Sequence, residues 1–358
     1  MTPCRFANLV RRFVASWTLA ALLGAAAWMP ALTLADDKTA QPTPSKPAAP
    51  TAASPVKLPP GVKMERDISY VPNGDAAQKL DLYLPEKPAE RPLPLIVHIH
   101  GGGWMGGNKF PCPVVGMVAK GYAVASVEYR FSQKAKFPAQ IQDCQAAIRW
   151  LRANNKQHNI DPERLGAVGG SAGGHLSALV GTAGGKNAFA PIGGNEDQSD
   201  RVQAVCDIFG PANFTTVMQQ ADDDKNVRNI FKFNSPSDPY SQLIGVSLEG
   251  NKEKTDAVSP VNYVSKDTPP ILILHGTHDA LVPLAQSEEF ADALKEKGVP
   301  VWLQKLPGSG HGGGGFAKPA IVNLMQNFFD KHLKGTDVKI ELVPEADVAV
   351  DPPKAAAK

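Results

Sequence analysis

A serine stands in the middle of a glycine-rich stretch, Gly169-Gly170-Ser171-Ala172-Gly173, which fits the pattern G-x-S-x-G. A strand pattern precedes this stretch and an apolar helical pattern follows it. A chain that passes directly from a strand into a helix must fold sharply at the serine, and glycine at positions 169 and 173 removes side chains that would collide across the turn. The hydroxyl is then raised above the sheet edge, beside the free N–H groups of a helix N-terminus. The spacing predicts that Ser171 is a nucleophile; the alternative is a glycine-rich turn with an idle serine.

A second glycine-rich stretch, His100-Gly101-Gly102-Gly103-Trp104, follows the apolar run "LPLIVHI". Attack on an acyl carbon places negative charge on an oxygen, which then needs N–H donors aimed at one point. Consecutive glycines allow the backbone to turn its amides in that way. We expect the amides of Gly102, Gly103 and Ala172 to form an oxyanion hole and Trp104 to bind substrate. The alternative is a plain flexible turn.

A serine nucleophile needs a base, and the base needs an acid that orients it. Downstream of Ser171, Asp279 lies in "LILHGTHDALVP" and His311 lies in "LPGSGHGGGGF". Each directly follows a strand pattern, so both are expected at the same sheet edge as Ser171. The sequence therefore predicts a Ser171, Asp279, His311 triad, with Asp256 and Asp267 as alternative acids.

Other histidines compete for the role of base. His98 is expected in the core, and His175, four residues after the serine, is expected to pack or hydrogen-bond locally. His275 and His278 are expected to shape the loop that carries Asp279. His158 and His332 are expected to lie at the surface. An alternative is a metal site with the ligands His98, His100, His275 and His278. This alternative is less favoured, because no carboxylates stand out as further ligands and the serine motif would remain unexplained. We expect no metal and no organic cofactor.

The elements that must position these residues alternate between strand and helix. The predicted elements are a hairpin around Asn73-Gly74 (65–85), strands within 93–100, 122–129, 161–168, 203–210, 270–276 and 301–308, and helices within 112–121, 137–155 and 318–333, besides the helix after Ser171. This order predicts a largely parallel sheet of eight strands with helices on both faces. Loops at the carboxyl ends of such strands build the site.

The N-terminal segment differs from the rest of the 358-residue chain. Residues 1–35 contain Arg5, Arg11 and Arg12, then an apolar run, then small residues at positions 33 and 35. This pattern predicts a secretory signal peptide, and so a secreted or periplasmic protein with no stable membrane span after cleavage. The alternative is an uncleaved membrane anchor.

Residues 36–60 are rich in Pro and Ala and predict a disordered linker. One α/β domain is expected over 61–335, and the tail 336–358 is expected to stay outside its core. Three cysteines fall within the domain, and we favour no disulfide between them; they are Cys112, Cys144 and Cys206. The net charge of +2 gives no electrostatic case for binding nucleic acid, and nothing in the sequence fixes an oligomeric state.

In these stretches the chain resembles α/β-hydrolases, and among them the HGGG-bearing esterases that include the hormone-sensitive-lipase-like carboxylesterases. It is more similar to secreted bacterial esterases of the bifunctional feruloyl and acetyl xylan esterase type. The matching stretches are "HGGGW", "VEYRFS", "FPAQIQDCQAAIRWLRAN", "DPERLGAVGGSAGGHLSAL", "FGPANF" and "HGTHDALVP". The resemblance carries the family's nucleophile, acid and base onto Ser171, Asp279 and His311, and its oxyanion glycines onto Gly102 and Gly103. The glycine run 312–315 departs from the family pattern.

The resemblance implies a serine esterase without a large separate cap, acting on a small or polysaccharide ester. We expect short acyl or aryl esters of carbohydrates as substrates, with an open cleft in which Trp104 and the aromatic residues of 211–262 face sugar rings. The alternatives are a general short-chain carboxylesterase or lipase, a prolyl-oligopeptidase-like peptidase, which would usually carry an upstream propeller domain, and a non-catalytic binding module.

Overall fold

The computed structural model describes residues 58–228 and 232–352. The predicted signal peptide and most of the predicted linker lie outside these residues. Eight strands form one sheet in the order β1-β2-β4-β3-β5-β6-β7-β8. The strands are β1 (Val62–Ser69), β2 (Lys79–Pro85), β3 (Leu93–Ile99), β4 (Ala123–Val127), β5 (Ile160–Gly170), β6 (Ala204–Ile208), β7 (Ile271–Gly276) and β8 (Val301–Leu306). The sheet confirms the predicted eight-stranded α/β-hydrolase fold.

The first two strands form the predicted antiparallel hairpin, and β2 pairs antiparallel with β4. All later neighbours, from β4 through β3 and β5 to β8, pair in parallel. Parallel pairing brings the carboxyl ends of β3, β5, β7 and β8 to one edge of the sheet. The loops after these four strands carry the HGGGW stretch, Ser171, Asp279 and His311.

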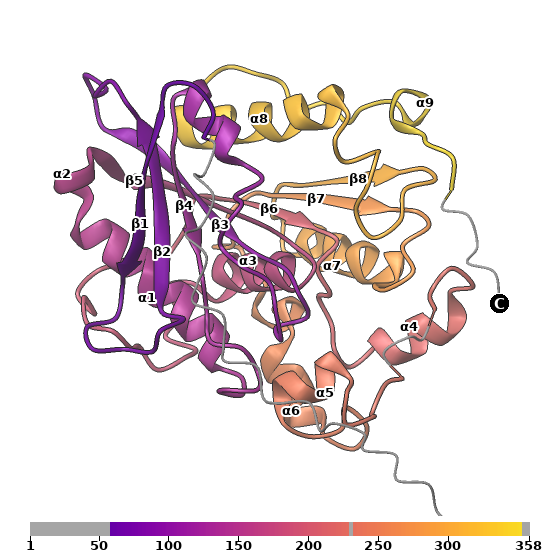
Figure 1. Ribbon diagram of the computed structural model, residues 1–358. Helices are drawn as coiled ribbons and strands as arrows, with labels where there is room; N and C mark the ends of the chain where they lie inside the picture. Colours follow the sequence, from indigo (N-terminus) through magenta and orange to yellow (C-terminus); the bar gives the residue numbers. More distant parts are fainter. Residues whose placement is uncertain (1–57, 229–231, 353–358) are drawn as a thin grey trace, which may run out of the picture. The chain divides into compact units, whose positions relative to one another are not determined.

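Helices cover both faces of the sheet (Figure 1). The longer helices are α1 (Ala139–Ala153), α3 (Ala172–Ala183) and α7 (Leu284–Glu296) on one face and α8 (Pro319–Lys334) on the other. The shorter ones are the 3₁₀ helices η1 (Val115–Lys120) and η2 (Pro260–Tyr263), and the α-helices α2 (Asn155–His158), α4 (Val217–Asp223), α5 (Pro239–Ile244), α6 (Lys252–Val258) and α9 (Glu345–Val348). Helix α7 was not among the elements predicted from the sequence.

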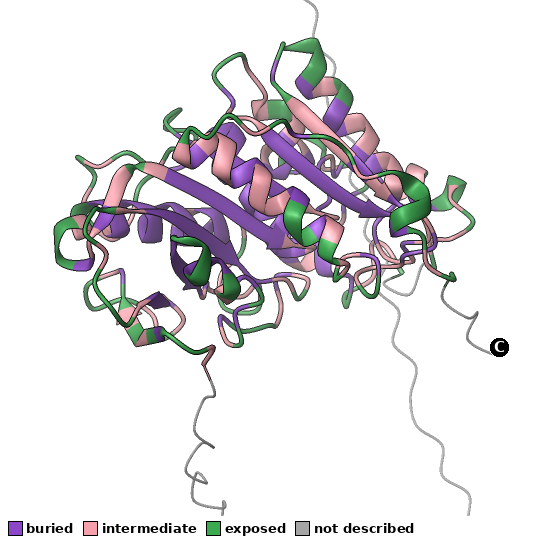
Figure 2. Cartoon of the chain, turned by 90° about the horizontal axis from the view of Figure 1, so that it is seen from above, coloured by how far each residue is buried: buried purple, intermediate pink, exposed green. Residues whose placement is uncertain are grey.

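The alternation of side chains along the strands produces two cores. On β3, Val97 and Ile99 pack toward α1 and α3, whereas Ile96 packs toward η1 and α8. Figure 2 shows the central strands buried along most of their length and the covering helices buried mainly on the side that faces them. A sheet buried on both faces fixes strand register firmly, because a shift of one residue would move every side chain to the wrong core.

The sequence expectations about burial are wrong for the tail and for His158. The tail packs on the domain: Ile340 is 8% exposed, Val348 is fully buried, and the Val350 amide donates to the Pro307 carbonyl. Isolated apolar residues in a polar segment gave no periodic signal for this packing. His158 is buried rather than on the surface, because it packs on Trp150 and pairs with Glu65.

The described residues contain no helix with both the length and the apolar character that crossing a membrane requires. The three domain cysteines, Cys112, Cys144 and Cys206, are buried and unpaired, as expected.

Candidate active site

Ser171 lies at a sharp turn between β5 and α3, with φ 57° and ψ −122°. A positive φ is strained for a residue that carries a Cβ, and such strain persists only where the surroundings enforce it. Here the Ser171 amide donates to the Ile208 carbonyl on β6, and the Ser171 carbonyl accepts from the His175 amide in the first turn of α3. These two hydrogen bonds fix the strained turn from both sides.

The glycines around the serine are required by the backbone. A Cβ on Gly169 would lie 2.4 Å from the carbonyl of Gly173, and a Cβ on Gly173 would lie 2.0 Å from the carbonyl oxygen of Ile99. The predicted collision across the turn therefore occurs, and the end of β3 adds a second one. The strand that leads into the HGGGW stretch is in this way pressed against the serine turn.

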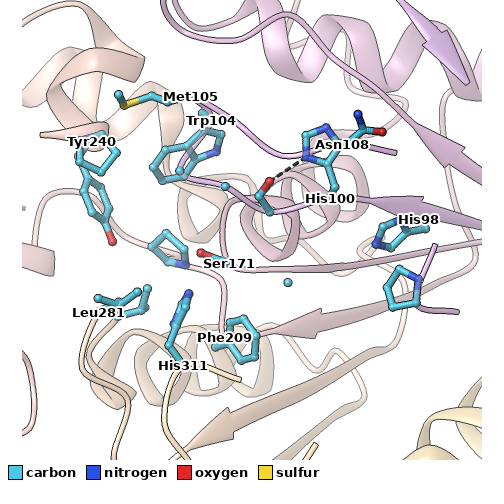
Figure 3. A pocket seen from close by; sticks show the side chains of 18 of the residues that line it. His98, His100, Trp104, Met105, Asn108, Ser171, Phe209, Tyr240, Leu281 and His311 are labelled. Atoms are coloured by element: carbon cyan, nitrogen blue, oxygen red, sulfur yellow. Dashed lines mark hydrogen bonds between the residues drawn. The ribbon is translucent and has the colours of Figure 1, made fainter. Parts of the chain in front are cut away.

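Asp279 and His311 are brought together as predicted, with His311 Nδ1 2.7 Å from Asp279 Oδ2. The carboxylate accepts, so Nδ1 carries the proton and the lone pair of the neutral ring lies on Nε2. Figure 3 shows that this end of the ring is directed toward Ser171. His311 and Ser171 line the same pocket. This is the geometry of a base that is oriented by an acid and aimed at a hydroxyl.

Asp279 is held in its ionised form by several donors. Its Oδ1 accepts the backbone amides of Leu281 and Val282 at 2.8 and 3.0 Å, and His275 Nε2 lies 3.3 Å from Oδ2. Burial raises the pKa of Asp279, but the hydrogen bonds from His275 and His311 outweigh burial and hold that pKa below its ordinary value. The acid therefore stays charged beside His311.

His275 has a defined role that the sequence only outlined. Its ring is fully buried, with Nδ1 2.7 Å from Ser287 Oγ and Nε2 3.1 Å from the Val282 carbonyl. Because that carbonyl only accepts, Nε2 carries a proton, which also faces Asp279. His278, by contrast, uses its backbone amide to bind the Ser309 carbonyl, which ties the acid loop to the loop of His311. Both histidines thus shape the acid loop, as expected.

The loop of His311 is supported by two phenylalanines and by glycine conformations. The ring of Phe209 lies 4.5 Å from the His311 ring and 4.9 Å from Phe316. Gly312 and Gly313 have φ of 90° and 99°, which side chains rarely adopt. The glycine run therefore folds a tight turn after the base. Phe209, which follows β6, opens the stretch "FGPANF" that marked the family resemblance, but no role in the site was predicted for it.

The HGGGW stretch passes beside Ser171 with its glycines at φ 115° for Gly102 and 61° for Gly103. Within the described residues, the amides of Gly102, Gly103 and Ala172 donate to no protein acceptor. The loop itself is held by His100, whose Nδ1–H donates to the Gly101 carbonyl and whose Nε2 lies 2.9 Å from a Glu128 carboxylate oxygen. Three amides beside the serine are thus free for an oxyanion.

A pocket of about 670 Å³ opens over Ser171. Figure 3 shows Trp104, Met105 and Tyr240 on one side of the serine and His98 and Asn108 on the other. The pocket therefore has an apolar arm and an arm that carries polar side chains. A volume of this size accommodates a small organic ligand.

The predicted open aromatic cleft is wrong. Trp104 lines the pocket but is only 2% exposed, because it packs on Phe214, Tyr240 and His175. Phe214 and Tyr240 are equally buried, at 1% and 2%. Residues of the segment between β6 and β7 pack against the Trp104 ring, so its faces are not available to a sugar. Phe231, which was also predicted to line the cleft, lies outside the described residues.

Two of the remaining histidines, His175 and His332, pack inside the protein. His175 accepts from Trp104 Nε1 at 3.1 Å and donates to the Val258 carbonyl at 2.8 Å, as expected for local packing. Burial lowers the pKa of His175 to about 4, so the ring is neutral. His332 is partly buried, between Trp302 and Phe328, rather than at the surface. Among the described residues no three His, Cys, Asp or Glu side chains gather as metal ligands.

Comparisons with known proteins identify the family to which the chain belongs. The BD-FAE family model matches residues 80–294, which is more than half of the chain. Esterase LipQ of Mycobacterium tuberculosis is 32% identical over 68% of this chain, and the match spans only 56% of LipQ. The chain thus spans about half the length of the curated relatives it matches.

Two solved structures are also similar. A truncated carbohydrate esterase from gut microbiota is 30% identical with a TM-score of 0.67, and the match covers 76% of this chain and 96% of that one. An acetyl ester-xyloside bifunctional hydrolase from Caldicellulosiruptor lactoaceticus is 27% identical with a TM-score of 0.53, and the match covers 72% and 85%. The sheet order, the strained serine turn and the family match agree: the chain belongs to the BD-FAE family of α/β-hydrolase-fold proteins.

Proposed function

We propose that this protein is a serine esterase that hydrolyses short acyl or aryl esters of carbohydrates, of the acetyl or feruloyl xylan type. The observation that carries the proposal is the pair of His311 Nδ1 and Asp279 Oδ2 at 2.7 Å, placed so that the opposite ring nitrogen faces Ser171 inside a pocket. Such a pair turns a weakly nucleophilic hydroxyl into an attacking group.

In the first step His311 Nε2 takes the proton of Ser171 as Oγ attacks the ester carbon. The carbonyl oxygen becomes an oxyanion that accepts from the amides of Gly102, Gly103 and Ala172. One donor of this kind typically lowers the barrier by about 3 kcal/mol. His311 then gives the proton to the leaving alcohol, and the acyl group remains on Ser171.

In the second step water attacks the acyl carbon while His311 Nε2 takes a proton from it. The tetrahedral intermediate collapses, the carboxylic acid leaves, and Ser171 Oγ regains the proton from His311. Asp279 remains ionised throughout and stabilises the imidazolium that forms twice in the cycle. The reaction uses only water and the ester.

The carbohydrate part of the proposal rests on similarity and on the polar arm. Two structurally similar proteins are described as a carbohydrate esterase and as an acetyl ester-xyloside hydrolase. The pocket arm that carries His98 and Asn108 offers hydrogen-bonding groups to a polar alcohol. The apolar arm, at Trp104, Met105 and Tyr240, suits an acyl group.

The test is a kcat/KM series on 4-nitrophenyl esters from acetate to palmitate, run beside acetylated xylan and methyl ferulate. We expect the value to fall steeply for acyl chains beyond about eight carbons, since a pocket of this size is short for a longer chain. We also expect release of acetate or ferulate from at least one plant-type substrate. A preference for palmitate without such release would instead support a general esterase or lipase.

We also propose that residues 1–35 direct export, so that the enzyme acts outside the cytoplasm. The support is the sequence pattern alone. Expression of the full chain, followed by fractionation and N-terminal sequencing, tests this. A new N-terminus near Asp36 in the exported fraction is expected; full-length protein in the membrane fraction would identify an anchor.

A further inference from the structure

The polar arm of the pocket contains a histidine that the proposed reaction does not use. His98 lies near the end of β3, and its side chain lines the pocket on the side of Ser171 that carries Asn108 (Figure 3). Its ring is only 5% exposed. A buried polar ring that borders a substrate pocket must either be satisfied by protein or present its free atom to the ligand.

The proton on the His98 ring can be located from its neighbours. Ser126 Oγ lies 2.6 Å from the carbonyl oxygen of Lys109, which can only accept, so the single hydroxyl proton is used there. His98 Nδ1 lies 2.8 Å from the same Ser126 Oγ. Ser126 must therefore accept from Nδ1–H, and the neutral ring has its lone pair on Nε2.

The ring is also held in its neutral form. Burial, and less so the neighbouring His100, lowers the pKa of His98 to about 3. Within the part of the chain that the structure describes, Nε2 has no hydrogen-bond partner. His98 thus presents a fixed acceptor to the pocket. Nε2 is not one of the described buried side-chain atoms that lack a partner, so this acceptor is open to the pocket, where a ligand hydroxyl can donate to it in place of water.

Asn108 complements this acceptor on the same arm. Its Oδ1 accepts from the amide of Phe110 at 2.8 Å, so its side-chain NH₂ remains as a donor. Asn108 also lines the pocket, on the same side of Ser171 as His98 (Figure 3). The polar arm thus offers both a donor and an acceptor to the hydroxyl groups of a polar alcohol.

We propose that His98 Nε2 accepts a hydrogen bond from a free hydroxyl on the alcohol part of the ester, so that the enzyme selects esters of polyols over esters of alkyl alcohols. The apolar arm on the other side of Ser171 receives the acyl group. This inference rests on the proposed esterase function and names a residue that determines its specificity.

The test uses two esters of equal size, 2-hydroxyethyl acetate and n-propyl acetate, in which a hydroxyl replaces a methyl group. The measured quantity is the ratio of their kcat/KM values. One net hydrogen bond corresponds to a ratio of about three to ten in favour of the hydroxy ester. A loss of activity that is merely structural would lower both values and leave the ratio unchanged.

Three variants separate the roles of His98. His98→Asn keeps a donor that reaches Ser126 but has no atom at the Nε2 position, so its ratio should fall at least three-fold below the wild-type ratio. His98→Gln places an amide oxygen near Nε2 and should retain more of the preference. His158→Asn, at a buried histidine that does not line the pocket, should keep the wild-type ratio.

The outcomes are distinct. Turnover of neither ester would overturn the proposed function, and this inference with it. Turnover without a wild-type preference for the hydroxy ester, or a wild-type ratio in His98→Asn, would overturn this inference alone. If His98→Asn proves too unstable to assay, His98→Phe, which also has no acceptor at the Nε2 position, takes its place: a ratio at least three-fold below the wild-type ratio would support the inference, and a wild-type ratio would overturn it.

Discussion

Replacing Asp279 by asparagine should switch the tautomer of His311. In the structure Asp279 Oδ1 accepts two backbone amides, from Leu281 and Val282. The asparagine oxygen must stay on these two donors, because the opposite orientation would place an NH₂ group against two N–H groups. The NH₂ group then occupies the Oδ2 position, 2.7 Å from His311 Nδ1. Nδ1 must accept, so the ring proton moves to Nε2, and His311 can no longer take the proton of Ser171.

The expected cost is about ten thousand-fold in kcat, by analogy with the same change in other serine triads. This corresponds to about 5.5 kcal/mol of barrier, at 1.36 kcal/mol for each factor of ten. KM should change little, since Asp279 does not line the pocket. The assay is hydrolysis of 4-nitrophenyl acetate, with kcat and KM reported separately and with thermal unfolding as a check on folding.

The matched control is Asp256→Asn. Asp256, on α6, was an alternative acid, but it pairs with Lys252 of the same helix, accepts from the Thr215 hydroxyl and does not contact His311. It should keep at least half of the wild-type activity. A loss of less than about ten-fold in Asp279→Asn, or an equal loss in the control, would refute the assignment of the acid and the argument from tautomers.

Two further predictions concern the backbone and the core. Gly173→Ala should abolish activity and lower the unfolding temperature, because its Cβ would lie 2.0 Å from a β3 carbonyl oxygen, whereas Gly116→Ala, with nothing within 4 Å of its Cβ, should be near neutral in the same assays. Burial raises the pKa of Asp207 to about 7, so from about pH 4 to pH 7 the folded state keeps a proton that the unfolded state loses. The free energy of unfolding of the wild type should therefore fall with rising pH relative to that of Asp207→Asn, by up to about 1.4 kcal/mol per pH unit. Chemical denaturation of both proteins at pH 4, 6 and 8 measures the difference between their free energies of unfolding. A difference that is independent of pH would contradict the prediction.

The positions of Ser171, Asp279 and His311 were predictable because the relevant signals are local. Each residue lies in the loop after a strand of the parallel part of the sheet, and parallel strands bring such loops to one edge. The glycines at 169 and 173 have a steric cause that the motif itself expresses, and the structure supplies the contacts. The second close contact of Gly173, with the Ile99 carbonyl oxygen at the end of β3, could not be predicted, because Ile99 lies 74 residues earlier in the chain (173 − 99).

The errors came from contacts between distant, isolated residues. Trp104 was expected to face a sugar, but Phe214 and Tyr240, single aromatics in a polar segment, close around it. Ile340 and Val348 show no helical or strand period, yet both are buried against the domain. Periodicity detects a face that repeats along one element, and it misses single side chains that fill a gap made by other elements.

The central claim is that Ser171 carries the acyl group, and covalent labelling tests it most directly. The wild-type protein is incubated with a fluorophosphonate probe, digested and mapped by mass spectrometry, and Ser171→Ala is treated in parallel and assayed for ester turnover. We predict one adduct, on Ser171, and a variant that folds normally, takes no label and retains less than about a hundredth of the wild-type activity, since loss of a triad nucleophile costs several orders of magnitude. Label on another residue, or a variant that keeps more than that fraction of activity, would contradict the account.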